Sequence, residues 1–266
     1  GLYQTNATGI RGQIGRSYSV SVTTEGGNIY QSRRERIVET PKIDSLYFQY
    51  EEKDVLLDQN ITVKGKSANI LIDFHDEITQ ENYYSWTWKN TYKFETFPEN
   101  FIGVDGVVDP LPCSFFGCNC CICWHTSEEQ NDLELAHDRL FNGRKVEKQL
   151  VATMPLKAGE FHFKHYINVS QKSISKEAFE FWSQIKEQES ASTLFATPPA
   201  KIKGNIININ NPGEDVWGYF SASDVKERAF YIYPYDIPGG LIDFNPINND
   251  CRTVPNATSQ QPSFWQ

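Results

Sequence analysis

Six cysteines are the side chains of this sequence with the clearest chemistry. Five are clustered and the sixth lies far along the chain; they are Cys113, Cys118, Cys120, Cys121, Cys123 and Cys251. An even count favours disulfides where a protein is exported. The sequence does not choose among the pairings, but a bridge from Cys251 back to the cluster would close a long loop and pin the tail to the fold. We therefore expect disulfides.

The same cluster also permits a metal site. Cys118 with Cys121 and Cys120 with Cys123 form two C-x-x-C pairs, and His125 follows them. Thiolates and imidazole nitrogens are the usual ligands of zinc, but zinc sites normally use two separate pairs, whereas these two overlap. Metal ligands and free or mixed thiols are thus the alternatives to disulfides. We predict no metal and no other cofactor.

Two other groups of side chains carry weaker signals. His162 and His165 lie in a predicted strand, where positions three apart point to opposite faces, so they do not predict a shared ion. Asp73, Asp76 and Glu77 suggest a pair of catalytic carboxylates or a calcium site, but a solvated strand end is the simpler interpretation. No hydrolase or phosphate-loop motif occurs in a persuasive setting, so we predict that the protein is not an enzyme.

These side chains must be positioned by a mainly β fold. The chain has 266 residues, of which 14% are aromatic, and aromatic residues favour strands. This length permits one large or two modest domains. The clearest strand spans residues 83–95, where ring side chains occupy most even positions and mostly polar side chains occupy the odd ones. The aromatic face of this strand is expected to face a core.

The rest of the chain has distinct patterns. Residues 96–130 form a long irregular stretch that holds most of the cysteines, and residues 131–149 are expected to be a loop or a short helix. One amphipathic helix is predicted at 175–189, because apolar side chains recur at helical spacing and Ser175 is a good N-cap. Further strands are expected at 160–170, 202–209, 216–221 and 229–233. The tail after Pro234 is expected to be irregular.

Residues 1–40 resemble the end of a domain. Alternation at 17–22 predicts a strand, residues 25–28 predict a hairpin turn, and Pro41 closes the segment. Because two strands alone are marginal, we expect this hairpin to complete a sheet whose other strands are missing or lie further along. We also expect an N-terminal portion to precede this chain. Residues 41–266 are assigned to a second β domain.

The charge of the chain argues against one class of partner. The formal net charge is −9, and an acidic chain repels nucleic-acid phosphates. The densest basic stretch holds Arg33, Arg34 and Arg36, is flanked by Glu35 and Glu39, and is interpreted as a solvated strand edge. The sequence contains no run of about 18 apolar residues, so it predicts no transmembrane helix.

Motifs along nearly the whole chain resemble one known family. They lie at 12–20, 28–32, 41–46, 82–86, 123–124, 198–206, 216–223 and 262–265. In this order they resemble the Bacteroidota outer-membrane lipoprotein family called domain of unknown function four-two-four-nine. The cysteine cluster at 118–123 is denser than the family pattern leads us to expect.

The resemblance implies a location and a role. Family members carry a lipoprotein signal peptide and further residues that form most of an immunoglobulin-like β-sandwich, which residues 1–40 would complete. They are anchored to the outer membrane through a lipidated cysteine, and their genes lie beside those of TonB-dependent receptors. The implied role is an accessory subunit, facing the cell surface, of a TonB-dependent receptor or another outer-membrane β-barrel assembly. The family has no established catalytic residues to transfer.

Two expectations concern specific places in the chain. Asp44-Ser45-Leu46 resembles the motif for O-glycosylation in this phylum, so Ser45 is a candidate attachment site. The partner surface is expected in 96–130 and 234–266, because exposed loops on a rigid sheet are where binding residues concentrate. The alternative function is a free-standing surface lipoprotein that binds carbohydrate, peptide or metal. A glycan hydrolase and a mainly structural component are the other rivals.

Overall fold

The computed structural model describes most of the chain: residues 9–57, 61–77, 81–115, 117–128, 133–157, 161–190, 201–239 and 246–266. Within these residues the protein is mainly β, as predicted, with fourteen strands and one α-helix longer than a single turn. The strands form four sheets of two, three, three and six strands. None of the helices described is both long and apolar enough to cross a membrane.

The six-stranded sheet is organised around one long central strand. Its strands are β7 (Tyr83–Glu95), β8 (Ile122–Glu128), β9 (Glu134–His137), β11 (His165–Ile174), β13 (Val225–Ile232) and β14 (Ala257–Thr258). One edge of β7 pairs with β11, which pairs in turn with β13. The other edge of β7 pairs first with β9 and then with β8, and β14 pairs with β8. All these pairs are antiparallel.

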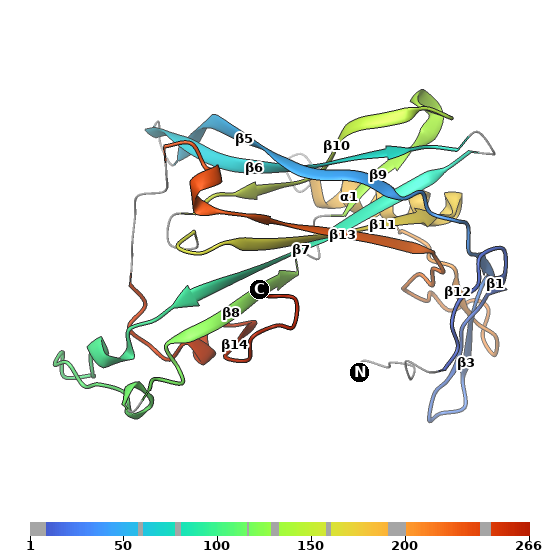
Figure 1. Ribbon diagram of the computed structural model, residues 1–266. Helices are drawn as coiled ribbons and strands as arrows, with labels where there is room; N and C mark the ends of the chain where they lie inside the picture. The colour runs from blue at the N-terminus through green and yellow to red at the C-terminus, as the bar shows by residue number, and fades with distance from the viewer. Residues whose placement is uncertain are drawn as a thin grey trace.

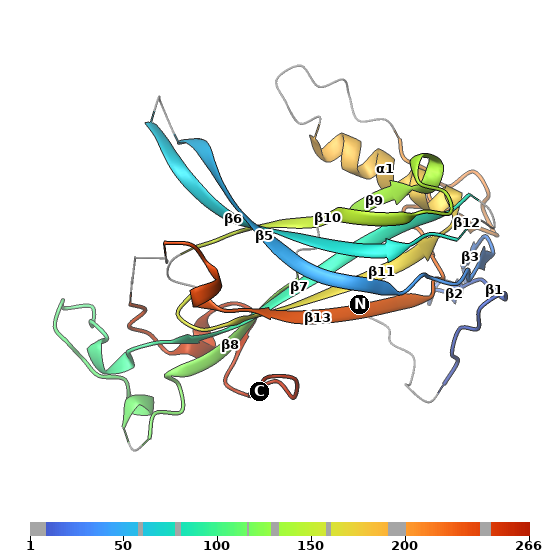
Figure 2. The same cartoon turned by 45° about the horizontal axis from the view of Figure 1, so that its top comes forward.

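A three-stranded sheet packs across the six-stranded sheet (Figures 1 and 2). Its strands, in the order β10-β6-β5, are β5 (Ile43–Leu57), β6 (Ile61–His75) and β10 (Lys145–Pro155). The main core lies between the two sheets. There the ring centroid of Phe74 on β6 lies 5.2 Å from that of Tyr84 on β7. The prediction that the aromatic face of β7 lies in a core is therefore confirmed.

The helix α1 (Lys176–Ser190) covers the other face of β7. Ser175 is its N-cap, as predicted, because Ser175 Oγ accepts a hydrogen bond from Ala178 N at 3.1 Å. Phe179 packs its ring on Tyr83, an odd-numbered residue of β7, with centroids 5.2 Å apart. The described part of the chain also contains five single-turn 3-10 helices: η1 (Pro98–Asn100), η2 (Pro112–Ser114), η3 (Asp138–Leu140), η5 (Pro234–Asp236) and η6 (Cys251–Thr253).

Two small sheets lie together at one end of the molecule (Figure 1). Their strands are β1 (Ser17–Tyr18), β2 (Ser21–Thr23), β3 (Ile29–Ser32), β4 (Glu35–Arg36) and β12 (Ile206–Asn208). β1 pairs with β4, while β3 pairs with β2 on one edge and with β12 on the other. The N-terminal hairpin thus gains a strand from a segment far along the chain. The domain division at residue 40 and the immunoglobulin-like sandwich stay predictions.

Several predicted elements differ from the structure. Residues 96–130, predicted to be irregular, contain β8, which pairs with β7, and the strand predicted at 17–22 is divided into β1 and β2. Residues 131–149, predicted as a loop or a short helix, contain β9 and the start of β10 where they are described, because pairing with β7 and β6 decides their conformation rather than local pattern. The predicted strand at 216–221 does not form; Gly218 there has φ +124°, which interrupts an extended strand. The strand predicted from residue 160 begins only at His165, after a turn.

Candidate functional site: a disulfide-bridged tip

At one end of the six-stranded sheet, β7 and β8 extend beyond β11. The pairing of β11 with β7 reaches Tyr92, and β7 then continues to Glu95 paired with β8. The chain between these two strand ends meets a segment from the carboxyl-terminal part of the protein (Figure 1). We call these two segments, residues 97–122 and 246–254, the tip.

Backbone hydrogen bonds join the two segments of the tip. Phe97 N donates to Ile247 O at 2.8 Å, and Cys251 N donates to Cys120 O at 3.0 Å. Each bond satisfies a backbone group of one segment with a group of the other. The two segments therefore form one ordered unit, although more than a hundred residues separate them in sequence.

All six cysteines are paired in or next to the tip. The bridges are Cys113–Cys120, Cys118–Cys121 and Cys123–Cys251. The last of these joins residues 128 apart in sequence, and both of its cysteines are fully buried. The Cys118–Cys121 bridge joins residues only 3 apart. The long bridge fastens the carboxyl-terminal segment to β8.

A small apolar cluster supports the tip. Phe94, Cys123 and Cys251 are buried, and Val254 and Ala257 pack against them. This cluster is much smaller than the core between the two large sheets. Small structural units gain little from hydrophobic burial and commonly depend on disulfides. The bridge from Cys251 is therefore a main source of rigidity in the tip.

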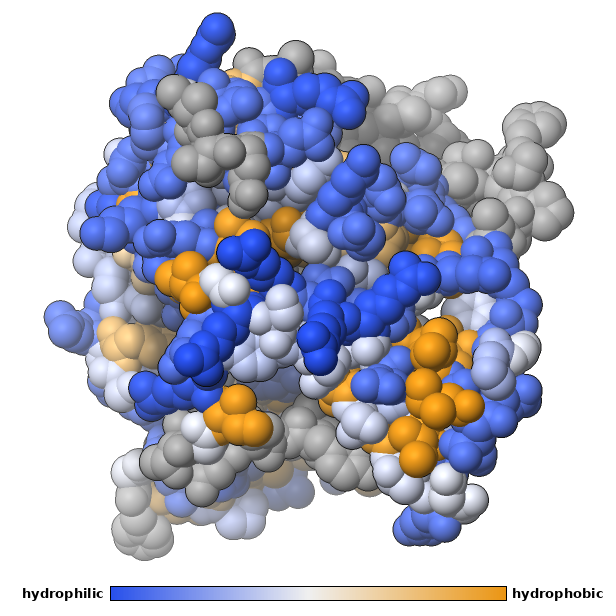
Figure 3. Space-filling view, turned by 90° about the vertical axis from the view of Figure 1, so that its right-hand side faces the viewer, coloured by the Kyte–Doolittle hydropathy of each residue, from blue (hydrophilic) through white to orange (hydrophobic). Residues whose placement is uncertain are grey.

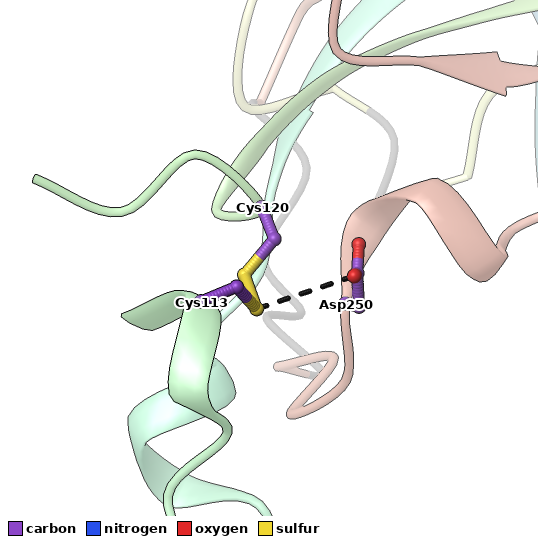
Figure 4. Close-up of side chains that lie close together, drawn as sticks. All are labelled: Cys113, Cys120 and Asp250. Carbon is purple, nitrogen blue, oxygen red and sulfur yellow. Dashed lines mark hydrogen bonds between the residues drawn. A yellow bond between two sulfur atoms is a disulfide. The ribbon is translucent and has the colours of Figure 1, made fainter. Parts of the chain in front are cut away.

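Asp250 lies beside the Cys113–Cys120 bridge (Figure 4). Its Oδ2 is 4.0 Å from Cys113 Sγ. The Sγ atoms of Cys113 and Cys120 and a carboxylate oxygen of Asp250 all lie within 4.8 Å of one another. Two thiolates and a carboxylate would suit a metal ion, but sulfurs in a disulfide are not thiolates. Asp250 instead caps η6, where Arg252 N donates to its Oδ1 at 2.8 Å. The hydrogen bonds from the Arg252 side chain lower the pKa of Asp250.

A small hairpin projects from the tip. Ile102 and Val108 form an antiparallel bridge, and Gly103 N donates to Val107 O at 2.9 Å. Gly106 closes the turn with φ +78°, a conformation that glycine adopts without steric cost. The sequence around this turn thus fixes its shape and leaves its apolar side chains outside.

The tip exposes a group of apolar side chains alongside charged ones such as Asp105 and Asp109. The exposed side chains are Ile102 at 56%, Val104 at 113%, Val107 at 61%, Val108 at 57%, Phe115 at 56%, Ile122 at 37% and Ile247 at 42%. Single exposed apolar side chains are ordinary, but a group of them on one feature is typical of a surface that contacts a protein or a membrane. Four of these side chains come from the small hairpin alone.

The structure brings together parts of the two segments in which a partner surface was predicted. Of 96–130, the tip contains 97–122, and of 234–266 it contains 246–254; residues 116, 129–130 and 240–245 lie outside the described part of the chain. The valines of the hairpin were not among the predicted site residues. Their signal was available, because a Gly-Val-Asp-Gly-Val-Val run places apolar residues in a turn that cannot bury them.

The acidic cluster near residue 76 has a structural role. Asp76 is fully buried, its Oδ1 accepts hydrogen bonds from Tyr84 Oη and from Asn82 Nδ2, and its Oδ2 accepts one from Gly143 N at 2.8 Å. The prediction of a solvated strand end is therefore wrong for Asp76, which fastens the end of β6 to the turn before β10. Burial raises the pKa of Tyr84, and the hydrogen bond to Asp76 raises it further.

The remaining candidates lie apart from the tip. His162 is exposed in the turn before β11, while His165 is buried with its Nδ1 2.9 Å from Asn90 Oδ1 and its ring stacked on Phe161. The two histidines serve different surroundings and do not form one site. Ser45 is half-buried on β5, the edge strand of the three-stranded sheet.

Comparisons with known proteins give one match. A family model described as Domain of unknown function (DUF4249) matches residues 1–229. No curated protein matches the chain, and no solved structure does. The matched range includes the hairpin and the five clustered cysteines, whereas residues 246–254 of the tip lie beyond it.

Proposed function

The chain belongs to the DUF4249 family, and we propose that it is a non-catalytic outer-membrane lipoprotein that acts as an accessory subunit. In this proposal it is lipid-anchored, faces the cell surface and binds a TonB-dependent receptor or another outer-membrane β-barrel assembly through its tip. The family description assigns no function, so the proposal rests on the tip and on the sequence resemblance described above.

The apolar surface of the tip is the observation that carries the proposal. Val104, Val107 and Val108 are each more than half exposed on a hairpin whose base is closed by the hydrogen bond from Asp109 N to Phe101 O at 2.7 Å. A rigid surface loses little conformational entropy on binding. Burying these three side chains against a partner would contribute roughly 4 kcal/mol, which is about a thousandfold in affinity.

The pairing of the cysteines supports export. Disulfides form and persist in oxidising surroundings and are rare in the cytosol. Three bridges in one tip therefore suit a protein of the cell envelope. The net charge of −9 suits a protein partner better than a nucleic acid.

Affinity purification tests the proposal. The full-length tagged protein is purified from native outer membranes in mild detergent, and co-purifying proteins are identified by mass spectrometry. We expect a stoichiometric β-barrel protein with the wild type and its loss with the double variant Val104→Asp/Val107→Asp. The matched control is Val22→Asp on β2, because Val22 is 50% exposed at the other end of the molecule. A wild-type protein that purifies alone at several salt concentrations would refute the proposal.

A free-standing ligand-binding protein is the second candidate. The observation that favours it is a cavity of about 440 Å³ whose lining includes Arg33, Arg34 and Arg36. Ligand binding by a protein that purifies without a barrel partner would favour this function over the first.

A further inference from the structure

A cavity of about 440 Å³ lies at the end of the molecule that carries β4 and the start of α1. Figures 1 and 2 place this end opposite the tip, and Figure 3 views it directly. Strongly hydrophilic side chains cross the middle of this face in Figure 3, beside an apolar patch. The volume falls within the range of small-ligand sites, roughly 300–1,000 Å³.

One wall of the cavity is basic. Arg33, Arg34, Arg36 and Lys203 line it and are exposed. Among the residues that the structure describes, no ion pair joins any of these four side chains to a carboxylate. The sequence interpretation of a solvated strand edge fits their exposure but not their arrangement around a cavity.

The adjacent acidic side chain, Glu35, also lines the cavity, but neutral donors bind its carboxylate. It is 5% exposed and accepts hydrogen bonds from Tyr219 Oη at 2.6 Å and from Asn205 Nδ2 at 3.2 Å. Both donors are neutral, and both come from a segment far along the chain. Burial, and then the hydrogen bond to Glu35, raise the pKa of Tyr219, so Tyr219 stays a donor at neutral pH. The Glu35 carboxylate is therefore held by neutral donors while the three arginines stay exposed.

The opposite wall offers a different chemistry. Glu177, Glu180 and Gln184 on α1, together with Ser175, present two carboxylates, an amide and a hydroxyl. Phe181 and Tyr219 also line the cavity, with ring centroids 4.9 Å apart. Carboxylates and amides accept hydrogen bonds from hydroxyl groups, and ring faces pack against apolar C–H surfaces.

We propose that this cavity binds a saccharide that carries a phosphate, sulfate or carboxylate group. Guanidinium groups bind such oxyanions with paired hydrogen bonds, so the anionic group would lie on the basic wall. The sugar hydroxyls would donate to Glu177 and Gln184, and a sugar face would lie near Phe181. A bare inorganic anion uses only the basic wall and is repelled by Glu177. This inference goes beyond the proposed function and does not depend on it.

Calorimetric titration at low salt tests the site in the full chain. The probes are glucose 6-phosphate, glucuronate, glucose and inorganic phosphate, together with phosphatidylglycerol vesicles as a lipid source of phosphate. We expect at least one anionic sugar to bind more tightly than either glucose or inorganic phosphate. Tighter binding to the vesicles, equal binding of inorganic phosphate, or no binding of either anionic sugar would overturn the proposal.

Three variants sharpen the test. Arg34→Gln/Arg36→Gln should lower the affinity for the anionic sugar about tenfold or more, because two charged hydrogen-bond donors to the anionic group are lost. Arg144→Gln removes an exposed arginine outside the cavity and should leave binding unchanged. Glu177→Ala should reduce the preference for the anionic sugar over inorganic phosphate, since it removes a hydroxyl acceptor that only the sugar uses and a charge that repels both probes. Equal effects of the double variant and the control, or an unchanged preference for the sugar over phosphate in Glu177→Ala, would contradict the proposal.

Discussion

Removal of the Cys123–Cys251 bridge should destabilise the protein far more than removal of the Cys118–Cys121 bridge. A cross-link restricts the unfolded chain, and its effect grows with the logarithm of the loop that it closes. The two bridges join residues 128 and 3 apart. These separations correspond to losses of about 5 and about 2 kcal/mol in the free energy of unfolding, a difference of about 3 kcal/mol.

Burial adds to this difference. Cys123 and Cys251 are fully buried in the small cluster with Phe94, so replacing their sulfurs by hydrogen also removes packing contacts. Cys118 and Cys121 are only half-buried, and their replacement removes less. The expected gap is therefore at least the value from loop length alone.

The assay is urea unfolding under non-reducing conditions, followed by tryptophan fluorescence. It compares the wild type with Cys123→Ala/Cys251→Ala and Cys118→Ala/Cys121→Ala, each as a double variant that leaves no free thiol. The first pair should lose about 3 kcal/mol more than the second. Equal losses for the two pairs, or a larger loss for the short bridge, would refute the reasoning that the long bridge anchors the tip.

Three further predictions concern stability. Val104→Asp should change the free energy of unfolding by less than about 0.5 kcal/mol, because an exposed side chain makes few contacts; a larger loss in urea would mean that the hairpin packs on the fold. Asp250 has its pKa lowered by Arg252, so its contribution is present above its unfolded pKa of about 3.9 and is lost as the pH falls through the lower folded value. Acid titration of stability should show this loss, and Arg252→Gln should reduce it; an unchanged acid profile would count against the pair. Gln171→Ala should cost about 3 kcal/mol, because the buried Gln171 accepts from Trp86 Nε1 at 2.8 Å; a loss below about 1 kcal/mol in urea would contradict this.

Short-range sequence patterns predicted the elements whose conformation depends on interactions between residues close in sequence. The helix α1 follows from the spacing of its apolar residues and from the cap at Ser175, both of which act within a few residues. The aromatic face of β7 follows from alternation, because a strand with one apolar face must bury it. In contrast, β9 and β10 have weak patterns of their own and depend on the strands that they join.

The sites depend on contacts that no local pattern specifies. The tip needs a segment around Cys251 that meets the cysteine cluster only after folding, so its geometry was not predictable from spacing. The basic cavity needs Glu35 to turn inward, which requires Tyr219 and Asn205 from a distant segment. Asp76 is similar, since its burial depends on a backbone amide near β10. The residue types were visible in the sequence, but their pairing was not.

The central claim is that the tip contacts an outer-membrane β-barrel partner. Its most direct test is site-specific photo-crosslinking in native outer membranes, with the photoreactive amino acid at position 104 on the hairpin and, as a control, at position 22 on β2. Val104 and Val22 are both exposed, and the tip and the small sheets that include β2 lie at opposite ends of the molecule (Figure 1). We predict a crosslink to a β-barrel protein from position 104 and none from position 22. A crosslink to such a protein from position 22 alone, or none from either position, would contradict the claim.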